Sequence, residues 1–138
     1  MLARAGPGAQ VGVALIDLDH FKQVNDRFGH AAGDEALRVV AKLLISECRP
    51  TDFAARLGGD EFVLVVQGEA GTAAAVCSRI LDRLRASGLA QGHAGPVLTI
   101  SAGVAETDRP EDPAAILARA DEALYRVKAA GRNGVRTA

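Results

Sequence analysis

Apolar residues fall into short continuous runs that alternate with stretches of helical spacing. Runs of this kind, bounded by turn-forming residues, predict buried strands. Four segments predict strands: 11–17, 53–57, 61–67 and 97–105. The second and third are joined across Gly58-Gly59, a pair that can adopt the positive φ values of a tight hairpin, so these two strands should be antiparallel.

Between the strands, apolar residues recur at spacings of three and four, which predicts helices. One helix runs from the region of Asp34 and Glu35, placed near its positive end, to Cys48, and Pro50 ends it. A second spans 76–84. Asp112-Pro113 supplies an N-cap and a first-turn proline for a third, through Val127. The stretch DHFKQVNDRFGHAAGD mixes short helical pattern with glycine, and Asn133-Gly134 predicts a turn into a terminal strand at 135–137.

The order of elements is strand, helices, strand, strand, helix, strand, helix, short strand. Its first six elements form a split βαβ–βαβ pattern, which predicts an α+β, ferredoxin-like fold. We expect a central, mostly antiparallel sheet with helices packed on one face. Residues 11–138 should form one domain, and residues 1–10, rich in Ala and Gly, should be disordered.

Composition narrows the class of protein. A chain of 138 residues suits one domain with a single core. The net charge of −1 and the 4% aromatic content argue against a nucleic acid polymer as ligand. No run reaches the apolar length of a membrane span, and Cys48 and Cys77 fall on apolar helix stripes, so we expect a soluble, cytoplasmic protein with free thiols.

Acidic residues gather at two strand ends. Asp17-Leu18-Asp19 ends the first strand, and Asp60-Glu61 follows the glycine pair. If the hairpin lies beside the first strand, Asp17 and Asp60 can face each other and share a cation, because carboxylates brought together otherwise repel. Hard oxygen ligands suit Mg²⁺ bound together with substrate phosphates. The alternative is a set of solvated loop acids, which is the usual state of a single aspartate.

The segment RLGGDEFVL contains GGDEF at 58–62, and the chain resembles the GGDEF-domain diguanylate cyclase family in other motifs as well. These motifs are DLDHFK at 17–22, ND at 25–26, FGHAAGDEAL at 28–37, TISAGVA at 99–105 and ADEALYRVKAAGRN at 120–133. The resemblance implies a nucleotidyl-cyclase palm that condenses two GTP molecules into cyclic di-GMP and releases pyrophosphate.

The resemblance also implies roles for individual residues. The metal ligands for Mg²⁺ (or Mn²⁺) would be Asp17, the Leu18 carbonyl, Asp60 and Glu61, with Asp60 or Glu61 as the catalytic base. Asn25 and Asp34 would bind guanine and exclude ATP. The remaining GTP-binding residues would be His20, Phe21, Lys22, Gly58, Gly59, Lys128 and Arg132.

A regulatory site is implied too. Arg49-Pro50-Thr51-Asp52 fits RxxD, five residues before GGDEF, and resembles the family's product-inhibition site. Arg79 and Arg83 are both candidates for an additional arginine there, and the sequence does not choose between them. His20 and His30 lack metal-ligand spacing, and we expect neither to bind a metal.

One domain binds one GTP, so the reaction implies a transient catalytic homodimer. The family's usual helix before the first strand, with its DxLT turn and NR pair, has no counterpart in MLARAGPGAQ, and in the family that segment links to a sensory domain. Two alternatives therefore stay open. One is a non-catalytic or truncated module that binds GTP or cyclic di-GMP, and the other is a polymerase-like palm with other chemistry.

Overall fold

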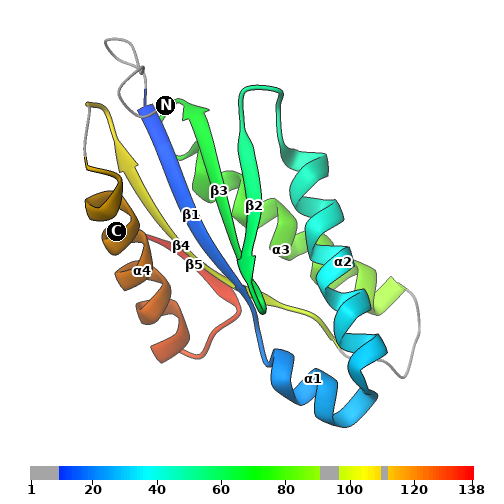
Figure 1. Ribbon diagram of the computed structural model, residues 1–138. Helices are drawn as coiled ribbons and strands as arrows, with labels where there is room; N and C mark the ends of the chain where they lie inside the picture. Colours follow the sequence, from blue (N-terminus) through cyan, green and yellow to red (C-terminus); the bar gives the residue numbers. More distant parts are fainter. Residues whose placement is uncertain (1–9, 91–96, 110–111) are drawn as a thin grey trace.

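A five-stranded sheet with the order β2-β3-β1-β4-β5 forms the centre of the fold (Figure 1). The computed structural model describes residues 10–90, 97–109 and 112–138. Disorder was expected for residues 1–10. Residues 1–9 lie outside the described part, and Gln10 belongs to the first strand. The elements are β1 (Gln10–Leu18), α1 (Phe21–Phe28), α2 (His30–Glu47), β2 (Phe53–Gly58), β3 (Glu61–Gly68), α3 (Thr72–Ala90), β4 (Ile100–Thr107), α4 (Pro113–Ala129) and β5 (Gly134–Thr137).

Strand β1 is the centre of this sheet, antiparallel to both neighbours. Asp17 lies opposite Glu61 of β3 on one side and opposite Ser101 of β4 on the other. The β2–β3 hairpin is antiparallel, as predicted, whereas β5 joins β4 in parallel. Because β1 ends where β3 begins, the end of β1 lies beside the hairpin turn. The predicted α+β palm, with its mostly antiparallel sheet, is confirmed.

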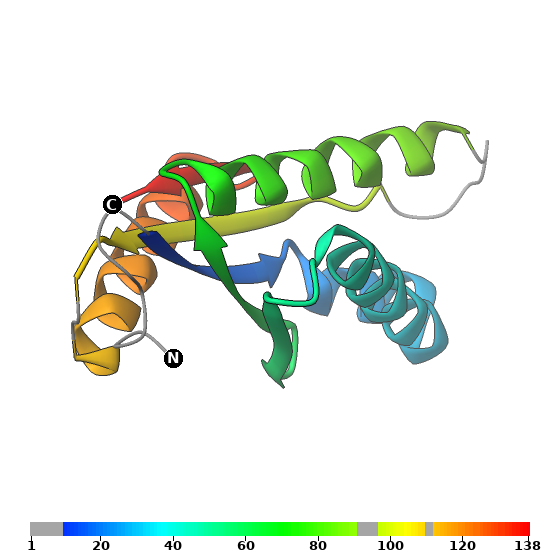
Figure 2. The ribbon, with the colours of Figure 1, turned by 90° about the horizontal axis from the view of Figure 1, so that it is seen from above.

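The expectation of helices on one face of the sheet holds for α2 and α3 but not for α4, which covers the opposite face. Alternate residues of β1 face opposite sides, and Ala14 and Ile16 join the core beneath α2 and α3, whereas Val13 joins a second core with Ile116 of α4. Figure 2 shows α4 across the sheet from α2 and α3. The signal was present in the sequence, because a continuous apolar run such as 11–16, rather than an alternating one, is typical of a strand covered on both faces.

Helix boundaries also differ from the prediction. The mixed stretch after β1 forms two helices that meet at Gly29, whose φ of 91° favours glycine. Helix α2 therefore starts at His30, and neither Asp34 nor Glu35 lies in its first turn. The N-cap of α4 is confirmed, since the Asp112 side chain accepts a hydrogen bond from the Ala114 N–H at 3.2 Å.

The predicted strand at 97–105 is shorter at its start, since β4 begins at Ile100 and continues to Thr107. Cys48 and Cys77 are free thiols, and burial raises the pKa of Cys77 to about 12. Among the described residues, none of the helices has the length and apolar character needed to cross a lipid bilayer.

The contact between β4 and α4 depends on Gly103, because glycine has no side chain. A Cβ atom there would lie 2.2 Å from both the Ala120 carbonyl oxygen and the Leu124 nitrogen. These are backbone atoms of α4, so no rotamer change can relieve the overlap. The helix therefore sits as close to the sheet as glycine allows.

Replacing Gly103 with Ala should lower the free energy of unfolding by about 1–3 kcal/mol, the usual effect of overpacking a core. Urea unfolding followed by circular dichroism measures the change. The matched control is Gly134→Ala, where the nearest atom would be Val127 Cγ1 at 3.7 Å, an ordinary contact. Equal stability of the two variants would contradict the proposed closeness of α4.

Candidate active site

The end of β1, the start of α1, the β2–β3 turn and the end of α4 meet around a cavity of about 190 Å³. We call it the phosphate cavity, after the role that the sequence predicts for its lining residues. Eight of the predicted site residues line it, together with two others. The lining residues are Asp17, Leu18, Asp19, His20, Phe21, Lys22, Gln23, Asp60, Lys128 and Arg132.

The antiparallel pairing of β1 with β3 brings the acids together. The Leu18 N–H donates to the Asp60 carbonyl oxygen at 3.1 Å, which joins the end of β1 to the turn. The turn residues Gly58 and Gly59 both have positive φ, at 148° and 50°. Arg56 also fastens the turn, since its Nε donates to the Gly59 carbonyl at 2.9 Å.

Not every predicted acid lines the phosphate cavity. Asp17 and Glu61 are directly opposite in the β1–β3 register, so they share a face of the sheet. Glu61 is exposed, however, and only Asp17 and Asp60 line the cavity with Asp19. In the described ranges, no three His, Cys, Asp or Glu side chains are gathered as a ready set of metal ligands.

Asp17 is buried beside a lysine of α4. The aspartate is 5% exposed, and its Oδ2 accepts a hydrogen bond from the Nζ of Lys128, a residue of α4. Burial raises the pKa of the Asp17 carboxyl, the Lys128 ammonium opposes that effect, and the charges of Asp60 and Asp19 add to it. Its second oxygen, Oδ1, is buried without a hydrogen-bond partner.

The donor set at this position fits a divalent magnesium ion. An unpartnered buried carboxylate oxygen is unfavourable, and a cation beside Asp17 Oδ1 would satisfy it. Asp60 and Leu18 line the same cavity, and a carboxylate and a backbone carbonyl are both hard oxygen donors. Because Mg²⁺ commonly takes one or two carboxylates and completes its shell with water and phosphate oxygens, the absence of a third gathered acid is compatible with it.

The start of α1 supplies positive potential to the same cavity. His20 adopts a left-handed conformation, with φ of 56°, and no side chain caps the first turn. Uncapped N–H groups at a helix start favour an anion. Lys22 and Arg132, both exposed at the cavity, carry further positive charge.

The two predicted guanine-binding residues lie apart from this cavity. Asn25 Oδ1 is buried without a partner. A Cβ atom on Gly33 would come within 1.7 Å of this oxygen, so the asparagine can hold its present side-chain position only beside a glycine. Asp34 is exposed and lines a second cavity of about 350 Å³ between α2 and β2.

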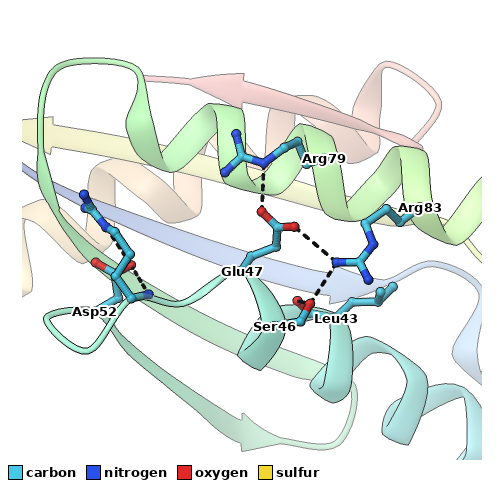
Figure 3. Close-up of polar contacts among 7 residues, drawn as sticks. Leu43, Ser46, Glu47, Asp52, Arg79 and Arg83 are labelled. Atoms are coloured by element: carbon cyan, nitrogen blue, oxygen red, sulfur yellow. Dashed lines mark hydrogen bonds and ion pairs between the residues drawn. The ribbon is translucent and has the colours of Figure 1, made fainter.

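The RxxD segment folds into a local turn after α2 (Figure 3). Asp52 Oδ2 accepts hydrogen bonds from the Arg49 backbone N–H at 2.8 Å and from Arg49 Nε at 3.4 Å. Arg49 also donates through Nη2 to the Gln67 carbonyl. The Asp52 side chain is 2% exposed and its Oδ1 is buried without a partner, so it retains an unused acceptor.

Arg79 and Arg83 reach from α3 to one carboxylate at the end of α2. Glu47 accepts from Arg79 Nε at 2.7 Å and from Arg83 Nη1 at 3.1 Å, as Figure 3 shows. The hydrogen bond from Arg79 lowers the pKa of Glu47, and Arg83 acts in the same direction. Both arginines thus bind Glu47, two residues before Arg49, and the structure does not choose between them.

Sequence reasoning gave no role to several polar residues around the site. Asp19 is 6% exposed and accepts three hydrogen bonds, from Thr99, Ser101 and the backbone of Asn133. Glu47 was also missed. A signal existed for Asp19, since it stands inside the acidic cluster beside a strand end, whereas nothing in the sequence pointed to Glu47.

These features define a class of protein: a palm-like α+β domain whose central strand carries acids into a cavity that is also lined by cationic residues. The sequence matches the family "Diguanylate cyclase, GGDEF domain" over residues 1–134. The chain belongs to this family.

Several relatives share this domain. The response regulator PleD of Caulobacter vibrioides is 45% identical over 135 residues, covering 93% of this chain and 29% of that protein. Diguanylate cyclase DgcP of Pseudomonas aeruginosa is 40% identical, covering 95% of this chain and 20% of that protein. The chain thus spans less than a third of these curated relatives.

Solved structures agree with the fold. The GGDEF domain of DgcB from Caulobacter crescentus in complex with c-di-GMP has a TM-score of 0.85 at 34% identity, covering 94% of this chain and 78% of that one. The active GGEEF domain of a diguanylate cyclase from Vibrio cholerae has a TM-score of 0.81 at 34% identity, covering 93% and 82%.

Replacing Asp17 with Asn should stabilise the metal-free protein at neutral pH. The folded state holds the Asp17 proton to a higher pH than the unfolded state, so stability falls as the pH rises from the ordinary pKa of 3.8 through the raised value. Lys128, which is half-buried, can be solvated once its partner is neutral. Urea unfolding with a chelator should show a larger gain at about pH 7 than at about pH 4.

Added Mg²⁺ should raise the unfolding midpoint of the native protein and leave that of the Asp17→Asn variant unchanged. The matched control is Asp26→Asn, at an exposed acid of α1.

The stability prediction has its own contrary outcome. If Asp17→Asn destabilised the metal-free protein at neutral pH, the hydrogen bond with Lys128 would outweigh the cost of burying the carboxylate.

Proposed function

We propose that this domain is a diguanylate cyclase that condenses two GTP molecules into cyclic di-GMP with release of pyrophosphate. The observation that carries the proposal is the placement of Asp17 and Asp60 in one cavity with the uncapped start of α1 and with Lys128. A triphosphate needs positive potential and a cation at the same place, and this cavity offers both. Family membership supports the same chemistry.

Divalent metal is the cofactor in this proposal, Mg²⁺ or Mn²⁺, held by Asp17, Asp60, the Leu18 carbonyl and, after movement into the cavity, Glu61. When bound, the metal supplies Lewis-acid stabilisation of the phosphoryl oxygens. Lys128 would then turn from the Asp17 carboxylate toward the phosphates, because the bound cation would offset the negative charge of Asp17 that attracts the lysine.

The protein's own groups account for the remaining steps. The 3′-oxygen of each GTP attacks the α-phosphorus of the other, its proton passes to Asp60 or Glu61, and one pyrophosphate leaves in each of the two attacks. Lys22 and Arg132 offset the negative charge that grows on the leaving pyrophosphate, and the N–H groups at the start of α1, near His20 and Phe21, bind its oxygens. Gly58 and Gly59 let the turn approach the nucleotide closely.

Guanine selectivity is assigned to Asn25 and Asp34. The buried, unpartnered Asn25 Oδ1 is an acceptor that the guanine donor edge can satisfy. Asp34, four residues into α2, can accept from the same edge. Adenine would leave these acceptors unpaired, so ATP should be rejected.

Because one phosphate cavity holds one triphosphate, the reaction needs two domains facing each other as a transient homodimer. The partners in this proposal are therefore GTP, cyclic di-GMP, a second copy of the domain and a sensory domain. Cyclic di-GMP would also bind at Arg49 and Asp52 as a feedback inhibitor. The unused Asp52 Oδ1 and the nearby Arg79 and Arg83 support that site.

With GTP and Mg²⁺, the purified protein should form cyclic di-GMP, detected by chromatography and mass spectrometry. The rate per enzyme should fall on dilution, because the competent dimer dissociates. Asp60→Asn and Glu61→Gln should each lower the rate by about 10²-fold or more, the usual effect of removing an acid–base group.

The matched control is Glu35→Gln, an exposed acid that pairs with Arg38 on the surface of α2. It should retain the native rate. If no product formed and cyclic di-GMP still bound tightly, the domain would be a binding module and not a cyclase.

Replacing Arg49 with Ala should relieve inhibition by the product and leave the initial rate intact, since Arg49 lies outside the phosphate cavity. Progress curves with added cyclic di-GMP measure the effect. We expect the half-inhibitory concentration to rise by about tenfold or more, the loss typical of a charged hydrogen bond to phosphate.

Arg126→Ala is the matched control, because Arg126 forms an exposed pair with Glu122 on α4, away from the RxxD turn. Its inhibition curve should coincide with the native one. If Arg49→Ala abolished the initial rate instead, the assignment of Arg49 to a regulatory site would be refuted.

A further inference from the structure

Asp19 lies next to the proposed metal-binding acids but has a different environment. Its Oδ1 accepts from Ser101 Oγ at 2.6 Å, and its Oδ2 accepts from Thr99 Oγ1 at 2.8 Å and from the Asn133 N–H at 2.9 Å. These three donors are uncharged, and both oxygens are already engaged. Asp19 is therefore poorly suited to bind a metal, although it lines the phosphate cavity.

The Asn133 N–H belongs to the turn between α4 and β5, whose backbone is unusual. Arg132 and Asn133 both have positive φ, at 66° and 55°. A non-glycine residue in this region costs about 1–2 kcal/mol, so two in succession persist only if other contacts hold them. The Asp19 carboxylate is one such contact, from the end of β1.

Arg85 of α3 provides a second contact with the same residue. Its Nη2 and Nε donate to Asn133 Oδ1 at 2.6 and 3.1 Å, and its Nη2 also approaches the Asn133 carbonyl oxygen at 3.3 Å. Asn133 is thus held through its N–H, its side chain and its carbonyl. The adjacent Arg132 side chain, within the described ranges, forms neither a hydrogen bond nor an ion pair and lines the phosphate cavity.

We propose that Asp19 is a positioning residue that, together with Arg85, holds the Arg132-Asn133 turn so that Arg132 is presented to the triphosphate. This inference rests on the role given to Arg132 in the proposed function. It assigns the two neighbouring acids to different tasks, since Asp17 faces the cation whereas Asp19 orients a cationic side chain.

The chemistry of the three donors predicts how substitutions at Asp19 behave. A serine or threonine hydroxyl can accept as well as donate, but a backbone N–H can only donate. Asparagine at 19 can keep its oxygen toward Asn133 and turn its amide toward Ser101. Asp19→Asn should therefore preserve the turn in part, whereas Asp19→Ala should release it.

The test is calorimetric binding of 3′-deoxy-GTP, which lacks the attacking hydroxyl, compared with GMP, which lacks the two outer phosphates. Asp19→Ala should lower the affinity for 3′-deoxy-GTP by about tenfold or more, as expected for losing a charged phosphate contact. It should leave the affinity for GMP unchanged. Asp19→Asn and Arg85→Ala should show smaller losses with the same selectivity. Arg85 lies on the α3 surface, so its variant keeps the test valid if Asp19→Ala fails to fold.

Two further variants separate positioning from general destabilisation. Ser101→Ala removes a buried hydrogen bond from Asp19 but leaves the bond to Asn133, so it should lower stability without the selective loss. In an Arg132→Ala background, Asp19→Ala should cause no additional loss of 3′-deoxy-GTP affinity, because the side chain that it places is already absent. Amide exchange at Asn133 should rise in Asp19→Ala and stay native in Arg132→Ala.

Additive losses in the double variant, or equal weakening of GMP and 3′-deoxy-GTP, would overturn the positioning role. If Arg132→Ala bound 3′-deoxy-GTP as well as the native protein, the triphosphate role of Arg132 in the proposed function would fail. Amide exchange at Asn133 would still report whether Asp19 holds the turn, so the two failures are distinguishable.

Discussion

The antiparallel pairing of β1 with both β3 and β4 is the constraint on which the rest of the site depends. It places the last residues of β1 beside the first residue of β3 and beside Ser101 of β4. Residues far apart in the chain thereby meet at one end of the central strands. They are the acids of 17–19, the glycine turn at 58–60 and the polar residues of β4. A slip of one residue in this register would turn Asp17 to the α2 and α3 face and separate it from Lys128.

Two neighbouring carboxylates in this site are stabilised in different ways. Asp17 is buried with a cation on one oxygen and no partner on the other, whereas Asp19 is buried with both oxygens accepting from uncharged groups. Only the first retains a capacity for a further positive ligand. Strand alternation does not explain the division, because residues two positions apart would share a face. It arises because β1 ends at Leu18, so Asp19 lies beyond the strand, where Thr99, Ser101 and the Asn133 N–H reach it.

Much of the fold was predictable because the apolar pattern is strong. The hairpin at Gly58-Gly59, the N-cap at Asp112 and the five strands were all anticipated, and each depends on local chemistry within a few residues. The placement of α4 was missed, although the continuous apolar run of β1 indicated two covered faces. Within the site, motif resemblance located Asp17, Asp60 and Lys128, but neither the contact of Lys128 with Asp17 nor the exposure of Glu61 could be inferred from them.

The sequence by itself determined the family, the order of strands and helices apart from the exact bounds of each, and the identity of the charged residues, since these depend on residue type and spacing. Tertiary structure alone decided which charges meet. Asp19 and Asn133 are 114 residues apart, and Arg79 and Glu47 are 32 apart, so no local pattern relates them. Their contacts arise from strand register and from the packing of α3 beside α2, and these are set by the burial of the whole apolar surface rather than by any single segment.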